Sequence, residues 1–365
     1  MNPDRLKEYF DKAAIPPPGW RDDLYFYNAA RQKIRYGFAP AQTSDKRGAM
    51  VLTLGYGEHI DLYHEAIKRY QDMGYDVWAM DWDGQGKSGR ANPDAPLKPH
   101  ADGMRRHVRD LDFFVRNVVQ KDRDSPLILT ANSMGGHVGL LYLKEHPGVF
   151  TAAVLSAPMF DIYRVGLSHP FRPVLKFIFN AACKLGFAEA HAPGGQGMLE
   201  KIGRISRRLR GFPEKPENVR EAWNRTLREK HPDAALGRPT FAWLVAAYET
   251  IEVSMSRAFL KSIRTPVLIA SAEYDDLVAN DSHKHAAKEL PDARHVTIKG
   301  AEHGLWFEDD DRYEALWGHI SDFLDAKNPP APGPNVTASA NLSFRAFRPD
   351  HPRLVREAPL YSHSH

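Results

Sequence analysis

Short apolar segments alternate with amphipathic segments of helical length along most of this 365-residue chain. The apolar segments are residues 49–55 (AMVLTLG), 76–81 (DVWAMD), 126–132 (PLILTAN), 151–158 (TAAVLSAP), 266–272 (PVLIASA) and 293–300 (ARHVTIKG). Strands that are apolar at successive positions have both faces covered, which is typical of parallel sheets with helical crossover connections. We therefore predict an α/β fold, with a mostly parallel sheet flanked by helices.

The alternation is interrupted between residues 160 and 262, where a largely helical pattern lies between two strands of the predicted sheet. The chain thus divides into a first part of the core (1–159), a helical insertion (160–262), a second part of the core (263–327) and a tail (328–365). The tail contains seven prolines and little periodicity, so we expect it to be disordered or laid along the surface. Near the N-terminus, residues 15–18 predict a proline-rich bend, and the runs DLYFYN and KIRYGF predict two short strands.

Composition excludes several classes of protein. With 49 basic and 46 acidic side chains, the net charge of +3 does not indicate nucleic-acid binding. The single cysteine, Cys183, leaves neither an internal disulfide nor a cysteine-based zinc site. The segment MNPDRLKEYF lacks the apolar core of a secretory signal, and no apolar run approaches the roughly 18 residues of a membrane span. We expect a cytoplasmic location and leave the oligomeric state open.

The sequence Ala-Asn-Ser-Met-Gly-Gly places Ser133 where a strand pattern changes to a helix pattern. A nucleophilic serine in this position stands on a tight, strained turn, and small neighbours let the strand and the helix approach each other. Ala131 and Gly135 meet that requirement, and the N-terminal end of the helix favours a developing negative charge. The alternative is that Ser133 is only the N-cap of the helix.

Two later strands end in residues that would activate such a serine. The strand PVLIASA is followed by Asp275 and Asp276, and the strand ARHVTIKG is followed by His303. The carboxyl ends of parallel strands are where open sheets hold their sites. Because a histidine takes the serine proton and a carboxylate orients the histidine, we predict a catalytic triad of Ser133, His303 and Asp275. Asp276 is the alternative acid.

Four segments resemble the α/β-hydrolase superfamily, and within it the serine hydrolases related to monoacylglycerol lipases and lysophospholipases, the serine aminopeptidase S33-type group. They are GYGEHIDLY (55–63), similar to the oxyanion loop; DWDGQGKSG (81–89), similar to the next strand-end turn; the ANSMGG elbow; and the segments AEYDDLV and GAEH that hold the acid and the histidine. The resemblance covers about residues 45–160 and 262–326, without the insertion or the tail, and implies the α/β-hydrolase fold.

The resemblance implies that the backbone amides of Tyr56 and Met134 form the oxyanion hole and that the insertion caps the pocket. It also implies hydrolysis of a carboxylic ester through an acyl-enzyme, with no metal or organic cofactor. The implied partner is a small-molecule ester or lipid, such as a lysophospholipid or a monoacylglycerol. The chain departs from the family where Leu54 replaces a histidine before the oxyanion loop, and where Ala131 and Asn132 replace Gly-His before the serine.

Other functions are compatible with these residues. The same triad serves transacylases, thioesterases and C–C hydrolases, because a fold does not determine the reaction. A non-catalytic binding protein that keeps the fold is a third hypothesis. Two competing motifs are weaker: Asp81 and Asp83 imitate a calcium loop in which Asn92 stands where glutamate belongs, and the glycine-rich run at 55 lacks its last glycine at Ile60.

The insertion carries a basic segment that is also partly apolar. Between Phe171 and Gly211 there are eight Lys or Arg against two Glu, together with several large apolar side chains. One interpretation is a lid whose apolar face accepts an acyl chain and whose basic face meets anionic head groups or a membrane surface. The other is a solvated basic helix face over an ordinary core, which is the commoner meaning of a charge run.

Overall fold

The computed structural model describes residues 2–90, 92, 94–100, 103–120, 125–162, 172–192, 208 and 211–328. The predicted tail falls outside this part of the chain except for Asn328, and so does most of the basic run at 201–211. Among the described residues, none of the helices combines the length and the apolar character needed to cross a membrane.

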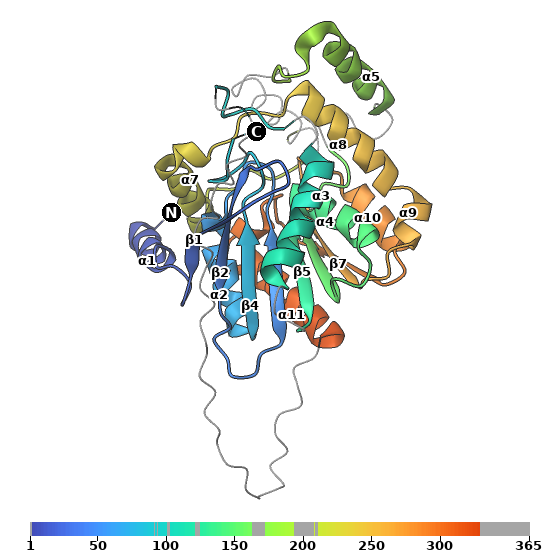
Figure 1. Ribbon diagram of the computed structural model, residues 1–365. Helices are drawn as coiled ribbons and strands as arrows, with labels where there is room; N and C mark the ends of the chain where they lie inside the picture. The colour runs from blue at the N-terminus through green and yellow to red at the C-terminus, as the bar shows by residue number, and fades with distance from the viewer. Residues whose placement is uncertain are drawn as a thin grey trace, which may run out of the picture. The chain divides into compact units, whose positions relative to one another are not determined.

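One sheet of eight strands forms the centre of the described chain (Figure 1). The strands are β1 (Arg21–Tyr27), β2 (Lys33–Ala39), β3 (Gly48–Thr53), β4 (Tyr75–Met80), β5 (Leu127–Asn132), β6 (Ala152–Ser156), β7 (Val267–Ala272) and β8 (Ala293–Ile298). Their order across the sheet is β1-β2-β4-β3-β5-β6-β7-β8. The β1–β2 and β2–β4 pairs are antiparallel and all others are parallel, which confirms the predicted fold class.

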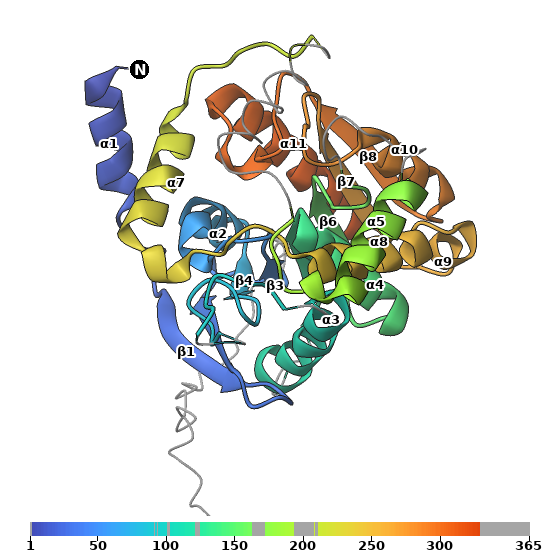
Figure 2. The same ribbon diagram turned by 90° about the horizontal axis from the view of Figure 1, so that it is seen from above.

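The described helices lie around this sheet, some of them on one of its two faces and others on further helices (Figures 1 and 2). They are α1 (Pro3–Ala13), α2 (His64–Asp72), α3 (Gly103–Phe114), α4 (Met134–Glu145), α5 (Arg172–Ala182), α7 (Val219–Lys230), α8 (Phe241–Ser254), α9 (Arg257–Lys261), α10 (Asn280–Glu289) and α11 (Asp310–Lys327), with short helical turns η1 (Ile60–Tyr63), η2 (Val115–Val119), η4 (Cys183–Phe187), η5 (Pro232–Ala234) and η6 (Leu305–Phe307). Tyr70 of α2 packs on Trp317 of α11, with ring centroids 4.8 Å apart. The helices α3 and α4 lie together over the other face (Figure 1).

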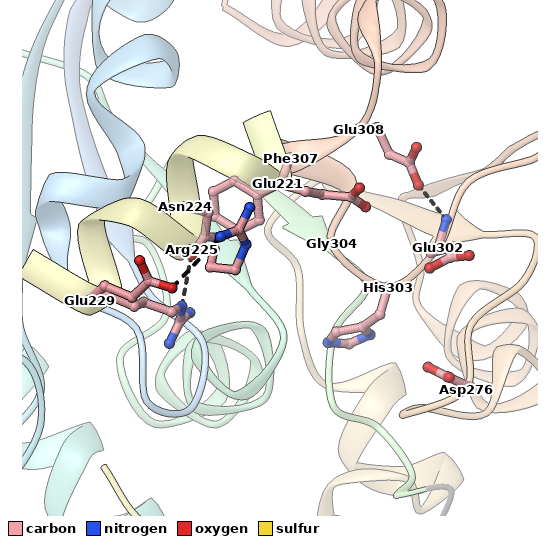
Figure 3. A pocket seen from close by; sticks show the side chains of 11 residues that line it. Glu221, Asn224, Arg225, Glu229, Asp276, Glu302, His303, Gly304, Phe307 and Glu308 are labelled. Carbon is pink, nitrogen blue, oxygen red and sulfur yellow. Dashed lines mark hydrogen bonds and ion pairs between the residues drawn. The ribbon is translucent and has the colours of Figure 1, made fainter. Parts of the chain in front are cut away.

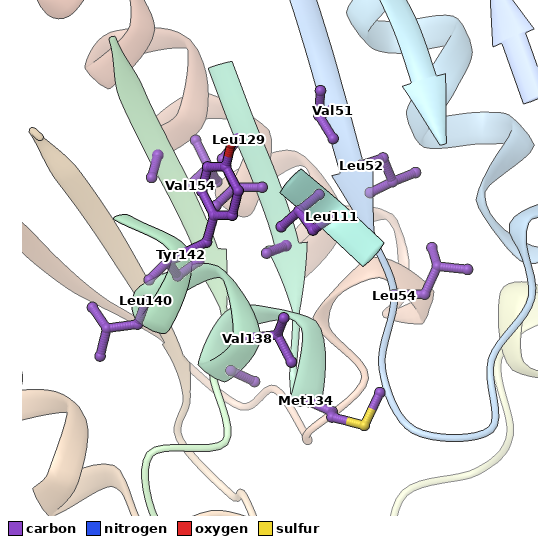
Figure 4. Close-up of a cluster of buried hydrophobic side chains, with 14 of the residues drawn as sticks. Val51, Leu52, Leu54, Leu111, Leu129, Met134, Val138, Leu140, Tyr142 and Val154 are labelled. Atoms are coloured by element: carbon purple, nitrogen blue, oxygen red, sulfur yellow. The ribbon is translucent and has the colours of Figure 1, made fainter. Parts of the chain in front are cut away.

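Helix α4 is the best buried of these elements. Its sequence MGGHVGLLYL has no charge before Lys144, and residues 134–143 are all buried. Figure 4 shows Leu129 and Val154, from β5 and β6, beside Tyr142 of α4. A fully buried side chain of this size contributes about 1.5–3 kcal/mol to stability. The residue that precedes α4, Ser133, therefore stands on one of the most firmly packed parts of the molecule.

The connection between β6 and β7 contains α5, η4, α7, η5, α8 and α9. Helix α5 packs on α8 through Phe179, whose ring lies 5.8 Å from that of Phe241 and 6.1 Å from that of Tyr248. Helix α7 is tied to the core by Arg220, which bonds both carboxylate oxygens of Glu65 at 2.9 and 2.7 Å and Asp310 at 2.9 Å. The division into domains at residues 160 and 262 stays a prediction.

The N-terminal region differs from the prediction by one helix. The two aromatic runs form the antiparallel hairpin β1–β2 as expected. Ahead of them, Asn2 caps α1 by accepting a hydrogen bond from the Asp4 amide, and Pro3 occupies the first helical position. None of the residues of α1 is fully buried, but Leu6, Phe10 and Ala13 follow helical spacing and are half-buried. The sequence therefore contains an amphipathic pattern that the prediction missed.

Candidate active site

Ser133 occupies a strained turn between β5 and α4. Its backbone has φ 48° and ψ −114°, a conformation that side-chain-bearing residues rarely adopt. The turn is held by hydrogen bonds from the Ser133 amide to the Ser156 carbonyl and from the Met159 amide to the Ser133 carbonyl, both 2.9 Å. Ser133 occupies the N-cap position of α4, but its hydroxyl makes no capping hydrogen bond to the helix, so capping alone does not explain the orientation of this side chain.

The glycines after Ser133 are required by close packing. A Cβ atom on Gly135 would lie 2.6 Å from the carbonyl oxygen of Leu54, and one on Gly136 would lie 2.7 Å from the Cβ of Pro158. Without these side chains, the first turn of α4 approaches the end of β3 and the loop after it. This approach places the amide of Met134, which has no acceptor within its own helix, beside the predicted oxyanion loop.

His303 and Asp275 meet Ser133 at the carboxyl edge of the sheet. The Nε2 atom of His303 lies 2.9 Å from the Ser133 hydroxyl oxygen, and its Nδ1 atom lies 2.8 Å from Oδ2 of Asp275. The turn after β7 supplies the acid and the loop after β8 the histidine. The structure therefore brings together the three side chains named from the sequence, from positions up to 170 residues apart.

Asp275, rather than Asp276, is the acid that reaches the imidazole. Its second oxygen, Oδ1, accepts hydrogen bonds from the amides of Leu277 and Val278, both 2.9 Å, and the residue is fully buried. Burial opposes ionisation of this carboxyl, but the charge of His303, their hydrogen bond and the two amides outweigh it. The pKa of Asp275 is accordingly lowered from its ordinary value, and the residue stays ionised at neutral pH.

The same pair shifts the histidine in the opposite direction. Burial pushes the pKa of His303 down, but the charge of Asp275 and its hydrogen bond, with smaller contributions from Glu58 and Asp276, raise it above the ordinary value. With Nδ1 donating to Asp275, neutral His303 presents Nε2 as an acceptor to the Ser133 hydroxyl. This tautomer suits a general base, and its protonated form is stabilised by the buried carboxylate.

The loop after β3 is braced by Glu58. Its carboxylate accepts hydrogen bonds from the Gly55 amide, from the Tyr63 hydroxyl at 2.6 Å and from the side-chain amide of Asn132 at 3.1 Å. A Cβ on Gly55 would lie 2.7 Å from this carboxylate, so glycine is needed for the contact. Glu58 is buried, and its hydrogen bond with Asn132 joins the predicted oxyanion loop directly to the residue before Ser133.

Further bonds hold the loop from other elements. Gln85 accepts from the Gly57 amide at 2.7 Å, and the Trp82 indole donates to the Leu54 carbonyl at 2.8 Å. The Tyr56 hydroxyl donates to the Gly237 carbonyl at 2.8 Å. The missing histidine at position 54 is thus compensated by bonds to the backbone of the loop. Sequence reasoning missed Asn132, Tyr63 and Gln85 as partners in this network, although all three are polar residues in or beside strand-end segments.

A cavity of about 520 Å³ lies beside His303. Figure 3 shows Asn224 and Glu229 of α7 on one side of it, with His303 and Glu302 on the other. The cavity is lined by Glu221, Asn224, Arg225, Arg228, Glu229, Asp276, Glu302, His303, Gly304, Phe307 and Glu308. Helix α7 and the loop of His303 therefore border a cavity that reaches the predicted triad at His303.

In the segment that resembles a calcium loop, the carboxylate of Asp81 is used in hydrogen bonds within the protein. The two carboxylate oxygens of Asp81 accept from the amides of Ile60 and Lys87, both 2.8 Å, and Arg35 lies 3.4 Å away. Within the described part of the chain, no group of three or more His, Cys, Asp or Glu side chains is arranged to hold a metal ion. Asp81 therefore connects the loop after β3 to the turn after β4.

Comparison with known families and proteins agrees with this geometry. Residues 44–310 match the family described as "Serine aminopeptidase, S33". The lysophospholipase L2 of Escherichia coli K12 is 30% identical over 321 residues, which cover 85% of this chain and 89% of that protein. The monoacylglycerol lipase of Mycolicibacterium smegmatis is 35% identical over 122 residues, covering 32% of this chain and 39% of that protein.

Solved structures show the same fold at lower sequence identity. A highly thermostable carboxyl esterase from Bacillus coagulans superimposes with a TM-score of 0.65 at 16% identity, covering 84% of this chain and 98% of the esterase. A soluble variant of the monoglyceride lipase from Saccharomyces cerevisiae gives a TM-score of 0.63 at 17% identity, covering 84% and 95%. At this identity the likeness concerns the arrangement of the sheet and helices.

Proposed function

Because the chain belongs to the serine aminopeptidase S33 family of α/β-hydrolases, we propose that it is a lipid ester hydrolase that works through an acyl-enzyme on Ser133. The observation that carries this proposal is the continuous hydrogen-bonded series from Ser133 to His303 to Asp275, with distances of 2.9 and 2.8 Å. This series supports nucleophilic catalysis because it places one imidazole nitrogen at the serine hydroxyl and the other at a buried carboxylate.

In the first step, the Ser133 oxygen attacks the ester carbonyl while His303 takes the hydroxyl proton at Nε2. Asp275 holds the ring through Nδ1 and stabilises its positive charge. When the tetrahedral intermediate collapses, the bond to the alcohol oxygen breaks and His303 returns the proton to that oxygen. The alcohol leaves, and the acyl group stays bonded to Ser133.

The amides of Tyr56 and Met134 are the proposed donors to the oxyanion. Such donors stabilise charge that develops only during the reaction, and each contributes about 2.7–4 kcal/mol in enzymes of this type. The Glu58 network supports this role because it holds the loop of Tyr56 against Asn132, next to Ser133. In the second step, His303 takes a proton from water as the water oxygen attacks the acyl-enzyme. The bond between the acyl carbon and the Ser133 oxygen then breaks, His303 returns the proton to that oxygen, and the carboxylic acid leaves.

The relatives support a lipid substrate. Those with the longest alignments are lysophospholipases L2, and shorter matches are monoacylglycerol lipases, so we propose a lysophospholipid or monoacylglycerol ester as the substrate class. The helices between β6 and β7 support a role as a cap, since Trp243 of α8 packs on Tyr56 of the oxyanion loop with ring centroids 4.8 Å apart.

Helix α5 and the turn η4 support the interpretation of the insertion as a lid that meets a lipid surface. Phe177 is 74% exposed and Leu185 is 75% exposed, and Val174, Ile178 and Phe187 are also exposed. Large apolar side chains gathered on one short segment favour reversible contact with an apolar phase. We include peripheral membrane contact in the proposal on this ground.

The first experiment is substitution of the nucleophile. Ser133→Ala should lower kcat/KM for p-nitrophenyl esters by roughly 10⁴- to 10⁶-fold while leaving the folded structure and unfolding temperature close to those of the parent. Retained turnover would refute the assignment of Ser133. Product analysis with a lysophospholipid and a monoacylglycerol then distinguishes release of free fatty acid from transfer of the acyl group to another alcohol or thiol.

A further inference from the structure

The cavity beside His303 has a markedly charged lining. Two arginines and five carboxylate side chains face it, from α7 on one wall and from residues near His303 on the other (Figure 3). A neutral glycerol needs hydrogen-bonding groups and gains little from such a set of charges. The lining therefore raises the question of which leaving group carries complementary charges.

Arg228 is the arginine that is available to a ligand. Its Nε atom donates to the side chain of Asn224 at 2.7 Å, and its Nη1 atom donates to the Gly57 carbonyl at 2.8 Å. Among the described residues no carboxylate forms an ion pair with it. Its guanidinium is thus positioned by two neutral acceptors, and its positive charge is not neutralised by a neighbouring acid in that part of the chain.

Arg225, one turn earlier on the same helix, shows the contrasting case. Its guanidinium forms a bidentate pair with Glu217 at 3.0 and 2.9 Å and lies 3.7 Å from Glu229. Because its charge is balanced within α7 and the segment before it, Arg225 is left out of the site argued here. The two arginines provide a matched pair that differs mainly in ion pairing.

The guanidinium of Arg228 lies close to the proposed reaction centre. Arg228 contacts the carbonyl of Gly57, the residue after Tyr56, and standard backbone dimensions place Nη1 within about 10 Å of the Tyr56 amide. In a lysophospholipid, the glycerol carbons separate the ester carbonyl from the phosphate by a span that fits inside this distance. An ester carbonyl bound at the Tyr56 amide could therefore place its phosphate at Arg228.

The carboxylates determine which phosphate ester fits. Five carboxylates and two arginines line the cavity, so its charge stays negative even though Glu229 lies 3.7 Å from Arg225 and Glu308 is paired with Lys215 at 2.5 Å. A headgroup with phosphate alone would be attracted by Arg228 and repelled by these carboxylates. A headgroup with a phosphate and an ammonium group satisfies both charges.

Building on the proposed lipid ester hydrolase activity, we propose that this cavity is a headgroup site for zwitterionic lysophospholipids, with the phosphate on Arg228 and the ammonium among the carboxylates. The leaving alcohol is then a glycerophospho-amine. The site makes the enzyme a lysophospholipase by preference, with monoacylglycerol as the poorer substrate.

The experiment compares three substrates with the same short acyl chain, kept below their critical micelle concentrations so that surface binding plays no part. They are a lysophosphatidylcholine, the corresponding lysophosphatidate and the corresponding monoacylglycerol. For the parent enzyme, we expect kcat/KM to be highest for the lysophosphatidylcholine. In Arg228→Gln, the ratio of kcat/KM for lysophosphatidylcholine to that for monoacylglycerol should fall by about 10- to 100-fold.

Three further variants test the proposal more narrowly. Arg228→Lys should restore part of the ratio because it restores the positive charge, whereas Arg225→Gln should change the ratio by less than about twofold. Glu302→Gln should shift the preference from lysophosphatidylcholine toward lysophosphatidate, because it removes negative charge from the cavity.

An equal loss on all three substrates in Arg228→Gln would overturn the headgroup site and leave Arg228 as a brace of the oxyanion loop. A parent enzyme that prefers monoacylglycerol would overturn it as well. Neither result would refute the proposed hydrolase activity. That proposal is refuted only if the parent enzyme cleaves none of the three esters or if Ser133→Ala retains activity.

Discussion

The Ser133 site and the helices between β6 and β7 are held by different kinds of contact. Ser133 and Asp275 follow β5 and β7, which, like β6, are buried throughout, and His303 follows the partly buried edge strand β8. The helix α7 is instead fastened by charged groups such as Arg220, while α5 exposes large apolar side chains such as Phe177. Rigid packing positions the reacting atoms, and a more polar and exposed set of contacts surrounds the substrate.

This difference suggests a division of labour. In the proposed mechanism, the ends of the sheet strands supply a nucleophile, a base and an oxyanion loop that would act on any ester. The helices supply the charged wall at Arg228 and the exposed apolar segment at α5, which would choose among esters. Changes in the sheet region should therefore affect all substrates alike, whereas changes in the helices should alter selectivity, surface binding or stability.

The largest effect should come from the buried acid. Asp275→Asn should lower kcat for p-nitrophenyl esters by about 10⁴-fold, because an amide at this position favours the wrong tautomer of His303. The measurement is steady-state kinetics on the purified variant, with unfolding temperature as the check on folding. Asp276→Asn keeps the bond between Asp275 and His303 and should lose far less; an equal loss would make Asp276 the catalytic acid.

The brace of the oxyanion loop should have the next largest effect. Glu58→Gln keeps the size of the side chain but replaces an acceptor of three hydrogen bonds with an amide, so we expect kcat to fall by about 10- to 100-fold. Since the loop serves every ester, the loss should be similar for lysophospholipid and monoacylglycerol. A loss confined to one of them would break the division between sheet and helices.

The pH dependence tests the electrostatics of the same region. Only neutral His303 accepts the serine proton, and its pKa is raised, so kcat/KM should fall on acidification with a midpoint above the ordinary value of about 6.5. Asp275→Asn should move this midpoint down. The raised pKa of His303 also stabilises the fold below its ordinary value, and that contribution is lost as pH rises through the folded-state pKa. The lowered pKa of Asp275 acts in the opposite direction, because its contribution is present above its ordinary value and is lost on stronger acidification. A midpoint below 6.5 would contradict the described charges.

The stability of α7 should depend on one arginine and not on another. Arg220→Ala removes a buried guanidinium that bonds Glu65 and Asp310 and stacks 4.0 Å from the ring centroid of Tyr313, so we expect a loss of about 1–3 kcal/mol in the free energy of unfolding. Arg225→Ala, on the exposed side, should show no measurable change. Urea unfolding of both variants makes the comparison, and equal losses would contradict the described anchoring.

The smallest effect should come from a substitution in α5, which exposes large apolar side chains, and it should concern binding to a lipid surface. Phe177→Ser should weaken binding to phospholipid vesicles by about tenfold, since one large apolar side chain no longer enters the lipid phase. Its kcat/KM for a soluble short-chain ester should stay that of the parent. Phe179→Ser is the contrasting variant, because Phe179 packs on α8 and its loss should lower stability. Unchanged vesicle binding in Phe177→Ser would remove α5 from the proposed surface.

The same two regions differ in how far the sequence predicts them. The central strands are evident because they are buried on both faces and thus apolar at successive positions. Ser133 and Asp275 follow two of these strands, β5 and β7, and His303 follows the edge strand β8. The contacts of Glu58 with Asn132 and of Arg228 with Gly57 join positions 74 and 171 residues apart. No local pattern encodes such pairs, so the bracing network and the charged cavity needed the folded structure.

The measurement that tests the central claim most directly is covalent labelling with a fluorophosphonate, followed by mapping of the modified peptide by mass spectrometry. We predict a single adduct on the Ser133 hydroxyl, absent in Ser133→Ala and formed far more slowly in His303→Ala at unchanged folding. An adduct on another residue, or labelling of Ser133 at the same rate without His303, would contradict the claim that the strand-end imidazole activates this serine.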